Sequence, residues 1–199
     1  MRGGAAPLLE RELGFRNITT GKRPLNKVED IAGLKLRVIP NAINVDWVKA
    51  LGANPTPLPF PEVYAALEQG AIDGQENPVS VIAANKFWEV QKNVAITNHQ
   101  YNPQSVMFSK KVWDTLSAAE KKILEDAAVE ATKSQREASR AALAANMDLL
   151  KKNGMSLTQF APAEVAKLRE RMKPVIEKHS AALGTTVADV QAELAKLRR

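Results

Sequence analysis

The residues best suited to chemistry lie in one short stretch, ALEQGAIDGQENP, at residues 66–78. Asp73 and Glu76 could form a carboxylate pair for acid–base catalysis. However, Asp73-Gly74 is also a common turn dipeptide. Glu76 comes just before an expected helix start, where the helix dipole stabilises a negative charge. A turn and a mainly structural Glu76 are therefore favoured over a catalytic pair.

Other catalytic candidates are few. The chain has two histidines, His99 in a polar segment and His179 among charges in a predicted helix. We expect a hydrogen-bonding loop role for His99 and a surface position for His179. The chain has no cysteine, which excludes disulfides, thiolate catalysis and thiolate zinc sites, and it shows no glycine-rich phosphate loop. We predict that the chain is not an enzyme and binds neither a cofactor nor a metal.

An anion-binding site is better supported. The segment GLKLRVIPN places Arg37 in an apolar strand, where alternation turns Arg37 away from its apolar neighbours. A buried charge is costly unless it is paired. Arg37 therefore has either a carboxylate partner within the protein or a cleft that takes an anion, and its planar fork suits a carboxylate. Asn77 leaves two interpretations open, a helix cap and a ligand amide.

The elements that would position these residues change in character near residue 116. Before it, short apolar runs broken by Pro, Gly and Asn predict strands and loops. Short helices are expected to begin at Pro61 and at Asn77-Pro78, with Asn77 as the N-cap. The first part of the chain is therefore predicted to be α/β.

A long helix is predicted from residue 117 to residue 153. SAAE at 117–120 is a capping-box pattern, and nothing interrupts the helix before Asn153. Its ends are apolar and its middle, TKSQREASR, is polar on every side, which suits a strut between two lobes better than a coiled coil. Beyond it we expect a strand at MSLTQF, a helix broken or kinked at Pro174 and a final helix.

Composition limits the class of protein. With 45% hydrophobic and 25% charged residues, the 199-residue chain has the composition of a globular protein. No apolar run approaches the roughly 18–20 residues of a membrane span, and the N-terminus does not have the pattern of a secretory signal. Lys and Arg outnumber Asp and Glu by 11 to 10 in residues 1–100 and by 17 to 12 in residues 101–199. This scattered excess favours a solvated surface over a nucleic-acid site.

Two stretches are distinctive, residues 33–82, GLKLRVIPNAINVDWVKALGANPTPLPFPEVYAALEQGAIDGQENPVSVI, and residues 86–117, KFWEVQKNVAITNHQYNPQSVMFSKKVWDTLS. They closely resemble the substrate-binding proteins of TRAP (tripartite ATP-independent periplasmic) transporters, the DctP-like family. The resemblance implies an α/β fold of the periplasmic-binding-protein type II class, with two lobes, a cleft and a bridging helix. It also implies a periplasmic receptor that passes an organic acid to the membrane subunits of a TRAP transporter.

The ligands implied by the resemblance are dicarboxylates, sugar acids and sialic-acid-like carboxylates. Arg37 would pair with the ligand carboxylate, and Asn77 would hydrogen-bond the same group. The other positions that match the family's pocket are Arg16, Asn41 and Phe60. A helical interaction module with a vestigial pocket is the alternative function. Neither nucleic acid nor direct membrane insertion is expected.

The chain also departs from the family pattern, because family members begin with an export signal and a long first segment. We therefore expect a chain that lacks most of the N-terminal lobe and carries no signal peptide. The expected divisions are a non-native or partial segment at 1–13, an α/β ligand-binding lobe at 14–116, an inter-lobe helix at 117–153 and a C-terminal strand with helices at 154–199.

Overall fold

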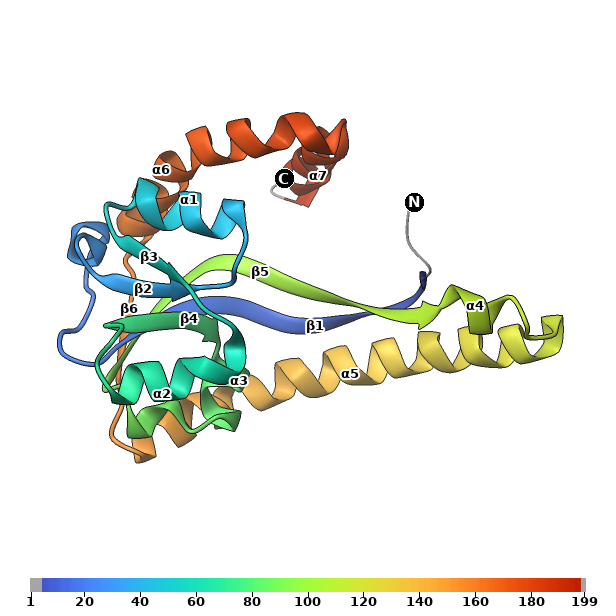
Figure 1. Ribbon diagram of the computed structural model, residues 1–199, viewed down its shortest axis with the longest axis horizontal. Helices are drawn as coiled ribbons and strands as arrows, with labels where there is room; N and C mark the ends of the chain where they lie inside the picture. The colour runs from blue at the N-terminus through green and yellow to red at the C-terminus, as the bar shows by residue number, and fades with distance from the viewer. Residues whose placement is uncertain (1–4, 198–199) are drawn as a thin grey trace.

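One mixed sheet with helices on both faces forms the body of the protein, and a two-stranded ribbon and a long helix extend from it (Figure 1). The computed structural model describes residues 5–197. The strand order is β3-β2-β4-β1-β5-β6. The strands are β1 (Ala5–Thr20), β2 (Lys35–Val38), β3 (Asn54–Pro57), β4 (Gly74–Pro78), β5 (Asn93–Ser109) and β6 (Ser156–Gln159).

The sheet contains three parallel and two antiparallel strand pairs. β2 is parallel to β3 and β4, and β5 is parallel to β6, whereas β1 runs antiparallel to both β4 and β5. The helices are α1 (Ala42–Ala50), α2 (Val63–Glu68), α3 (Val79–Ala84), α4 (Lys110–Trp113), α5 (Ala118–Lys152), α6 (Pro162–Ser180) and α7 (Thr186–Leu197).

The hydrophobic core lies on both faces of the sheet. On one face, Trp47 of α1 and Leu168 of α6 pack with Ala95 of β5. On the other face, Ile82 of α3 and Leu150 of α5 pack with apolar residues that include Val94 and Ile96 of β5. Alternate residues of β5 therefore serve opposite faces, as the pleat of a strand requires.

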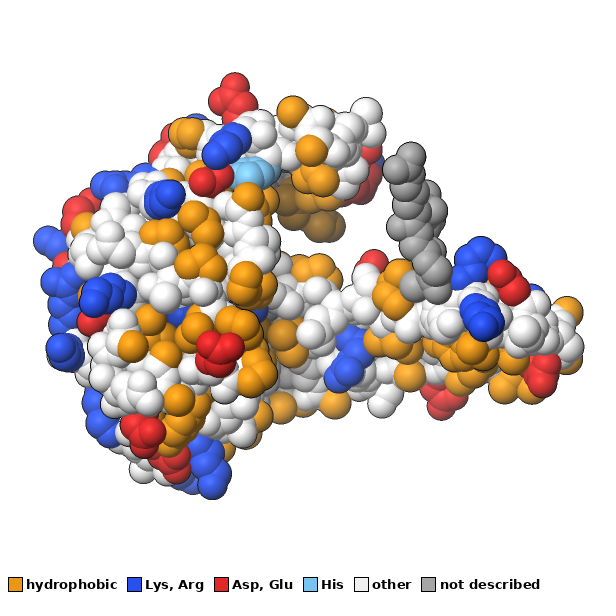
Figure 2. Space-filling model, in the orientation of Figure 1, with side chains coloured by type: hydrophobic (Ala, Val, Ile, Leu, Met, Phe, Trp, Pro, Cys, Tyr) orange, Lys and Arg blue, Asp and Glu red, His pale blue; other side chains and the backbone are white. Residues whose placement is uncertain are grey.

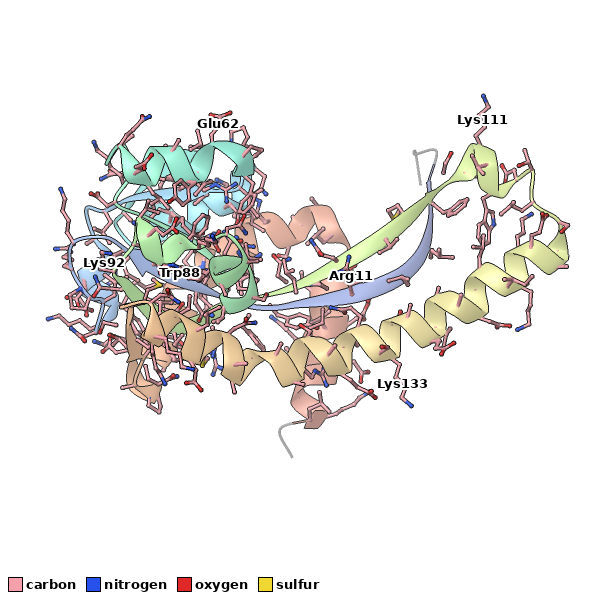
Figure 3. All side chains as sticks on the ribbon, turned by 90° about the horizontal axis from the view of Figure 1, so that it is seen from below. Arg11, Glu62, Trp88, Lys92, Lys111 and Lys133 are labelled. Carbon is pink, nitrogen blue, oxygen red and sulfur yellow. The ribbon has the colours of Figure 1, made fainter. Side chains whose placement is uncertain are left out.

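Helix α5 agrees with the prediction from sequence. The Ser117 side chain accepts from the Glu120 N–H, and the Glu120 carboxylate accepts from the Ser117 N–H, which closes the expected capping box. The helix then runs for 35 residues beside the β1–β5 ribbon, and Lys133 points away from the ribbon (Figure 3).

The polar middle of α5 has a specific partner in β1. The Gln135 side-chain amide accepts from the Glu12 N–H and donates to the Glu12 carbonyl, each at 2.9 Å. Arg140 forms an ion pair with the Glu12 carboxylate at 2.8 Å. The β1–β5 register shifts between Glu12 and Gly14, so these backbone groups are available to a side chain. Gln135, Ser139 and Arg140 thus bind polar groups of the strand, and the other polar residues of this part of α5 include exposed ones.

Several expectations from sequence were wrong. Asn77 is not a helix cap but a residue of β4, where it pairs with Asn17 of β1, and Pro78 occupies the N-cap position. Gly74 also lies in β4 and not in a turn; a Cβ there would overlap the carbonyl oxygen of Thr19, so the glycine permits close strand approach.

Three further observations concern single elements. Strand β1 runs across residue 13, where the first division is proposed, and its first residues pair with β5. Of the break or kink expected at Pro174, the break is absent: helix α6 continues through the proline, and Val175 and Met172 beside it pack on the core. His99 lies in β5 and not in a loop.

Among residues 5–197, no helix combines the length and apolar character needed to cross a membrane.

Candidate functional site

An open pocket of about 520 Å³ lies where β2 and β4 end. The carboxyl ends of strands are where ligands of open α/β sheets commonly bind. Four of the five site residues predicted from sequence line it, together with amide and apolar side chains. The lining residues are Leu13, Arg16, Arg37, Ile39, Pro40, Phe60, Asn77, Val81, Asn85, Asn102 and Gln104.

Arg37 brings an unbalanced positive charge to this pocket. Its side chain is only 2% exposed, and its Nε donates to the Leu58 carbonyl at 2.8 Å. The guanidinium carbon lies 5.8 Å from the Phe60 ring centroid, a cation–π contact. Within the described part of the chain Arg37 has no carboxylate partner, and its two terminal nitrogens are open to the pocket. Burial lowers the pKa of Arg37, against the influence of Glu76, but a guanidinium stays protonated in proteins.

Arg16, in contrast, is fully engaged by the protein. Its Nε and Nη2 donate to the two carboxylate oxygens of Glu76, and Nη2 also donates to the Glu76 carbonyl at 2.6 Å. Its Nη1 donates to Asn102 Oδ1 at 3.0 Å. Arg16 and Glu76 are 3% and 1% exposed. The charge of Arg16 is therefore balanced, and the guanidinium forms a rigid wall of the pocket.

Behind this wall, His99 contacts Glu76. The His99 Nε2 lies 3.3 Å from Glu76 Oε2, within ion-pair distance but without the alignment of a hydrogen bond. The His99 Nδ1 lies 2.8 Å from Thr97 Oγ1, and the ring packs on Trp47 with centroids 4.9 Å apart. Burial would raise the pKa of Glu76, but His99 and Arg16 together outweigh it and hold that pKa below its usual value. Glu76 is therefore ionised at neutral pH.

The two asparagines predicted at the site differ in position. Asn77 is 4% exposed, lines the pocket and donates from Nδ2 to Gln75 Oε1. Asn41 does not line the pocket: it caps α1, where its Oδ1 accepts from the Asn44 N–H at 2.9 Å. Sequence reasoning missed Asn102 and the direct engagement of Glu76, since both depend on contacts across the sheet.

The carboxylate pair considered for catalysis does not assemble. Asp73 accepts from the Lys35 N–H at 2.8 Å, at the start of β2, whereas Glu76 is enclosed by Arg16 and His99. The two carboxylates thus serve different neighbours. Within residues 5–197 there is also no cluster of His, Asp and Glu suited to hold a metal ion.

Comparison with known proteins gives consistent matches. The profile of the family described as "Bacterial extracellular solute-binding protein, family 7" (DctP) matches residues 5–182. The sialic acid-binding periplasmic protein SiaP of Vibrio cholerae is 38% identical over 177 residues, which are 88% of this chain and 54% of SiaP.

Two solved structures are similar over nearly the whole chain. A TRAP periplasmic solute-binding protein from Ochrobactrum anthropi has 50% identity and a TM-score of 0.88, over 98% of this chain and 61% of that one. The sugar acid-binding protein of Advenella mimigardefordensis, in complex with galactonate, has 38% identity and a TM-score of 0.91, over 98% and 63%. The chain thus spans little more than half the length of these relatives. The predicted α/β fold of the periplasmic-binding-protein type II class is confirmed.

Proposed function

The chain belongs to the DctP family of bacterial extracellular solute-binding proteins, family 7, and we propose that it binds an organic acid in the pocket beside Arg37. Members of this family are solute-binding proteins and not enzymes. The observation that carries the proposal is the contrast between two buried arginines. Arg16 has an internal carboxylate partner, whereas Arg37 has none among residues 5–197 and directs its free nitrogens into the pocket.

In this proposal Arg37 holds the ligand carboxylate through parallel hydrogen bonds. Phe60 lies against the guanidinium, and Asn77 offers a neutral amide in the same pocket. Arg16 keeps the opposite wall in place through Glu76 and Asn102. Asn41 acts through the start of α1 and not as a ligand contact.

The ligand class is drawn from the chemistry of the pocket and from what similar proteins are named for. Amide side chains of Asn77, Asn85, Asn102 and Gln104 line it beside the arginine, and such groups suit hydroxyl-bearing carboxylates. Similar proteins are described as bound to galactonate, D-erythronate or succinate. We propose periplasmic uptake, with the membrane subunits of a TRAP transporter as partners. We also retain, as a proposal, an inter-lobe role for the helix at 117–153 and a ligand-binding role for the preceding α/β part.

Nuclear magnetic resonance of the arginine side chains tests the proposal. The ¹⁵N-arginine-labelled chain would be titrated with galactonate and, as the uncharged control, with galactitol. We expect the Arg37 Nε resonance to shift with galactonate and not with galactitol, while Arg16 shifts less. A set of sugar acids and dicarboxylates that all leave Arg37 unmoved would contradict the proposal and favour a pocket without a ligand.

A further inference from the structure

Exposed cations gather at the end of the sheet opposite the anion pocket. β1 ends there, whereas β2, β4 and β5 begin there. Hydrogen bonds join the connecting segments: the Lys92 N–H donates to the Thr20 carbonyl, at 3.1 Å. The Asp73 N–H donates to the Lys35 carbonyl, at 2.9 Å. We name this surface the basic end and define it by the exposed residues Lys22, Arg23, Lys27, Lys35, Lys49, Lys92 and Lys152.

Basic side chains are visible along this margin of the molecule (Figure 2), and Figure 3 labels Lys92 there. Within the described part of the chain these seven cations make no ion pair, whereas the neighbouring Lys151, Lys167 and Arg171 pair with acids. The carboxylates on this surface are fewer than its seven cations, and one of them, Glu29, is paired with Lys167. These carboxylates are Glu29, Asp30, Glu68, Asp73 and Glu89. A net positive charge therefore remains.

The chemistry of this surface indicates the kind of partner. Six of the seven cations are lysines. Lysine is a compact, strongly hydrated charge and is depleted in specific protein interfaces, where arginine and aromatic residues are enriched. The large apolar side chains exposed in residues 5–197 include none from 16–42 or from 61–100. These two ranges hold five of the seven cations, so most of the basic end lacks the apolar anchors of a protein interface; Leu149, one helical turn from Lys152, is 40% exposed.

We propose that the basic end binds the surface of a bilayer containing anionic phospholipids, through charge and without insertion. Each lysine close to such a surface raises the affinity by about fivefold. The basic end and the anion pocket lie at opposite ends of the same strands, so the charges of the basic end are separate from the ligand site. The proposal is independent of which organic acid the pocket takes.

Co-sedimentation with lipid vesicles tests this, using phosphatidylcholine vesicles with and without phosphatidylglycerol. A variant with Lys22→Gln, Lys27→Gln and Lys92→Gln removes three charges from the basic end. The matched control, Lys111→Gln, Lys133→Gln and Arg136→Gln, removes three unpaired charges from exposed residues elsewhere and has the same net charge. Circular dichroism melting verifies that both variants are folded.

We expect the chain to bind only the vesicles with phosphatidylglycerol, and to be released as salt shortens the Debye length below about 10 Å. The basic-end variant should lose at least about tenfold in affinity, and the control less than about threefold. Equal losses in the two variants would show that net charge alone acts and would overturn the proposal. Failure of the unaltered chain to bind anionic vesicles at low salt would also overturn it, and would leave an acidic protein as the partner to seek.

Discussion

The substitution Arg37→Lys distinguishes an anion anchor from a structural arginine. Lysine keeps the positive charge but loses the planar fork, and it cannot reproduce the Nε bond to Leu58 while also reaching into the pocket. A hydrogen bond to a charged group contributes about 1.5–3 kcal/mol. Loss of one of two parallel bonds should therefore cost at least about 1.4 kcal/mol, a tenfold weakening of sugar-acid binding.

The assay is calorimetric titration with galactonate beside a thermal melting curve. Arg16→Lys is the matched control, because Arg16 lines the same pocket at a similar depth but is paired with Glu76. We expect Arg37→Lys to weaken affinity and change the melting temperature little, whereas Arg16→Lys should mainly lower the melting temperature. A folded Arg37→Lys protein with unaltered affinity would refute the assignment of Arg37 as the anion anchor.

Four further predictions concern stability, each measured by urea or thermal unfolding. Glu76→Gln should destabilise the fold by about 3–5 kcal/mol, since it leaves a buried arginine without its partner. Because the folded-state pKa of Glu76 is lowered, its contribution is present above the unfolded pKa of about 4.3 and is lost as pH falls through the folded value; Glu76→Gln should flatten this acid limb. Gly74→Ala should cost roughly 1–3 kcal/mol, because its Cβ meets Thr19; a neutral effect would show that the strands can separate. Gln135→Leu should cost about 1–3 kcal/mol and speed hydrogen exchange at the Glu12 amide, which the Lys133→Leu control should leave unchanged.

The parts of the fold that depend on neighbouring residues could be predicted from the sequence. The capping box at Ser117 and the uninterrupted helix after it are local signals, and α5 follows them. The strand containing Arg37 also follows local alternation. Asn77 followed a local rule too, but pairing with Asn17 of β1 placed it in a strand instead. A cap signal of about 1 kcal/mol is outweighed when sheet pairing and burial act on the same residue.

The internal pairing of the pocket could not be predicted, because it joins distant residues. Glu76 is 60 positions from Arg16, and Asn102 is 86 positions from it. The sequence contains two arginines that suit an anion, and only the folded arrangement shows which has a carboxylate of its own. The same applies to charge: counted along the chain, Lys22 and Lys92 are scattered, and the sheet brings them to one end.

The contact between Glu12 and Gln135 fixes α5 to β1 near the middle of the helix. From Gln135 to Ala118 the helix extends for about 26 Å at 1.5 Å per residue. A rotation of α5 by about 5° about this contact would therefore displace the Ala118 end by roughly 2 Å. A shift of that size is enough to exchange one set of side-chain contacts for another. That arm exposes apolar surface, with Ile123 67% and Val129 74% exposed. A protein that packed on those side chains would therefore be displaced when the angle of α5 beside the anion pocket changed slightly.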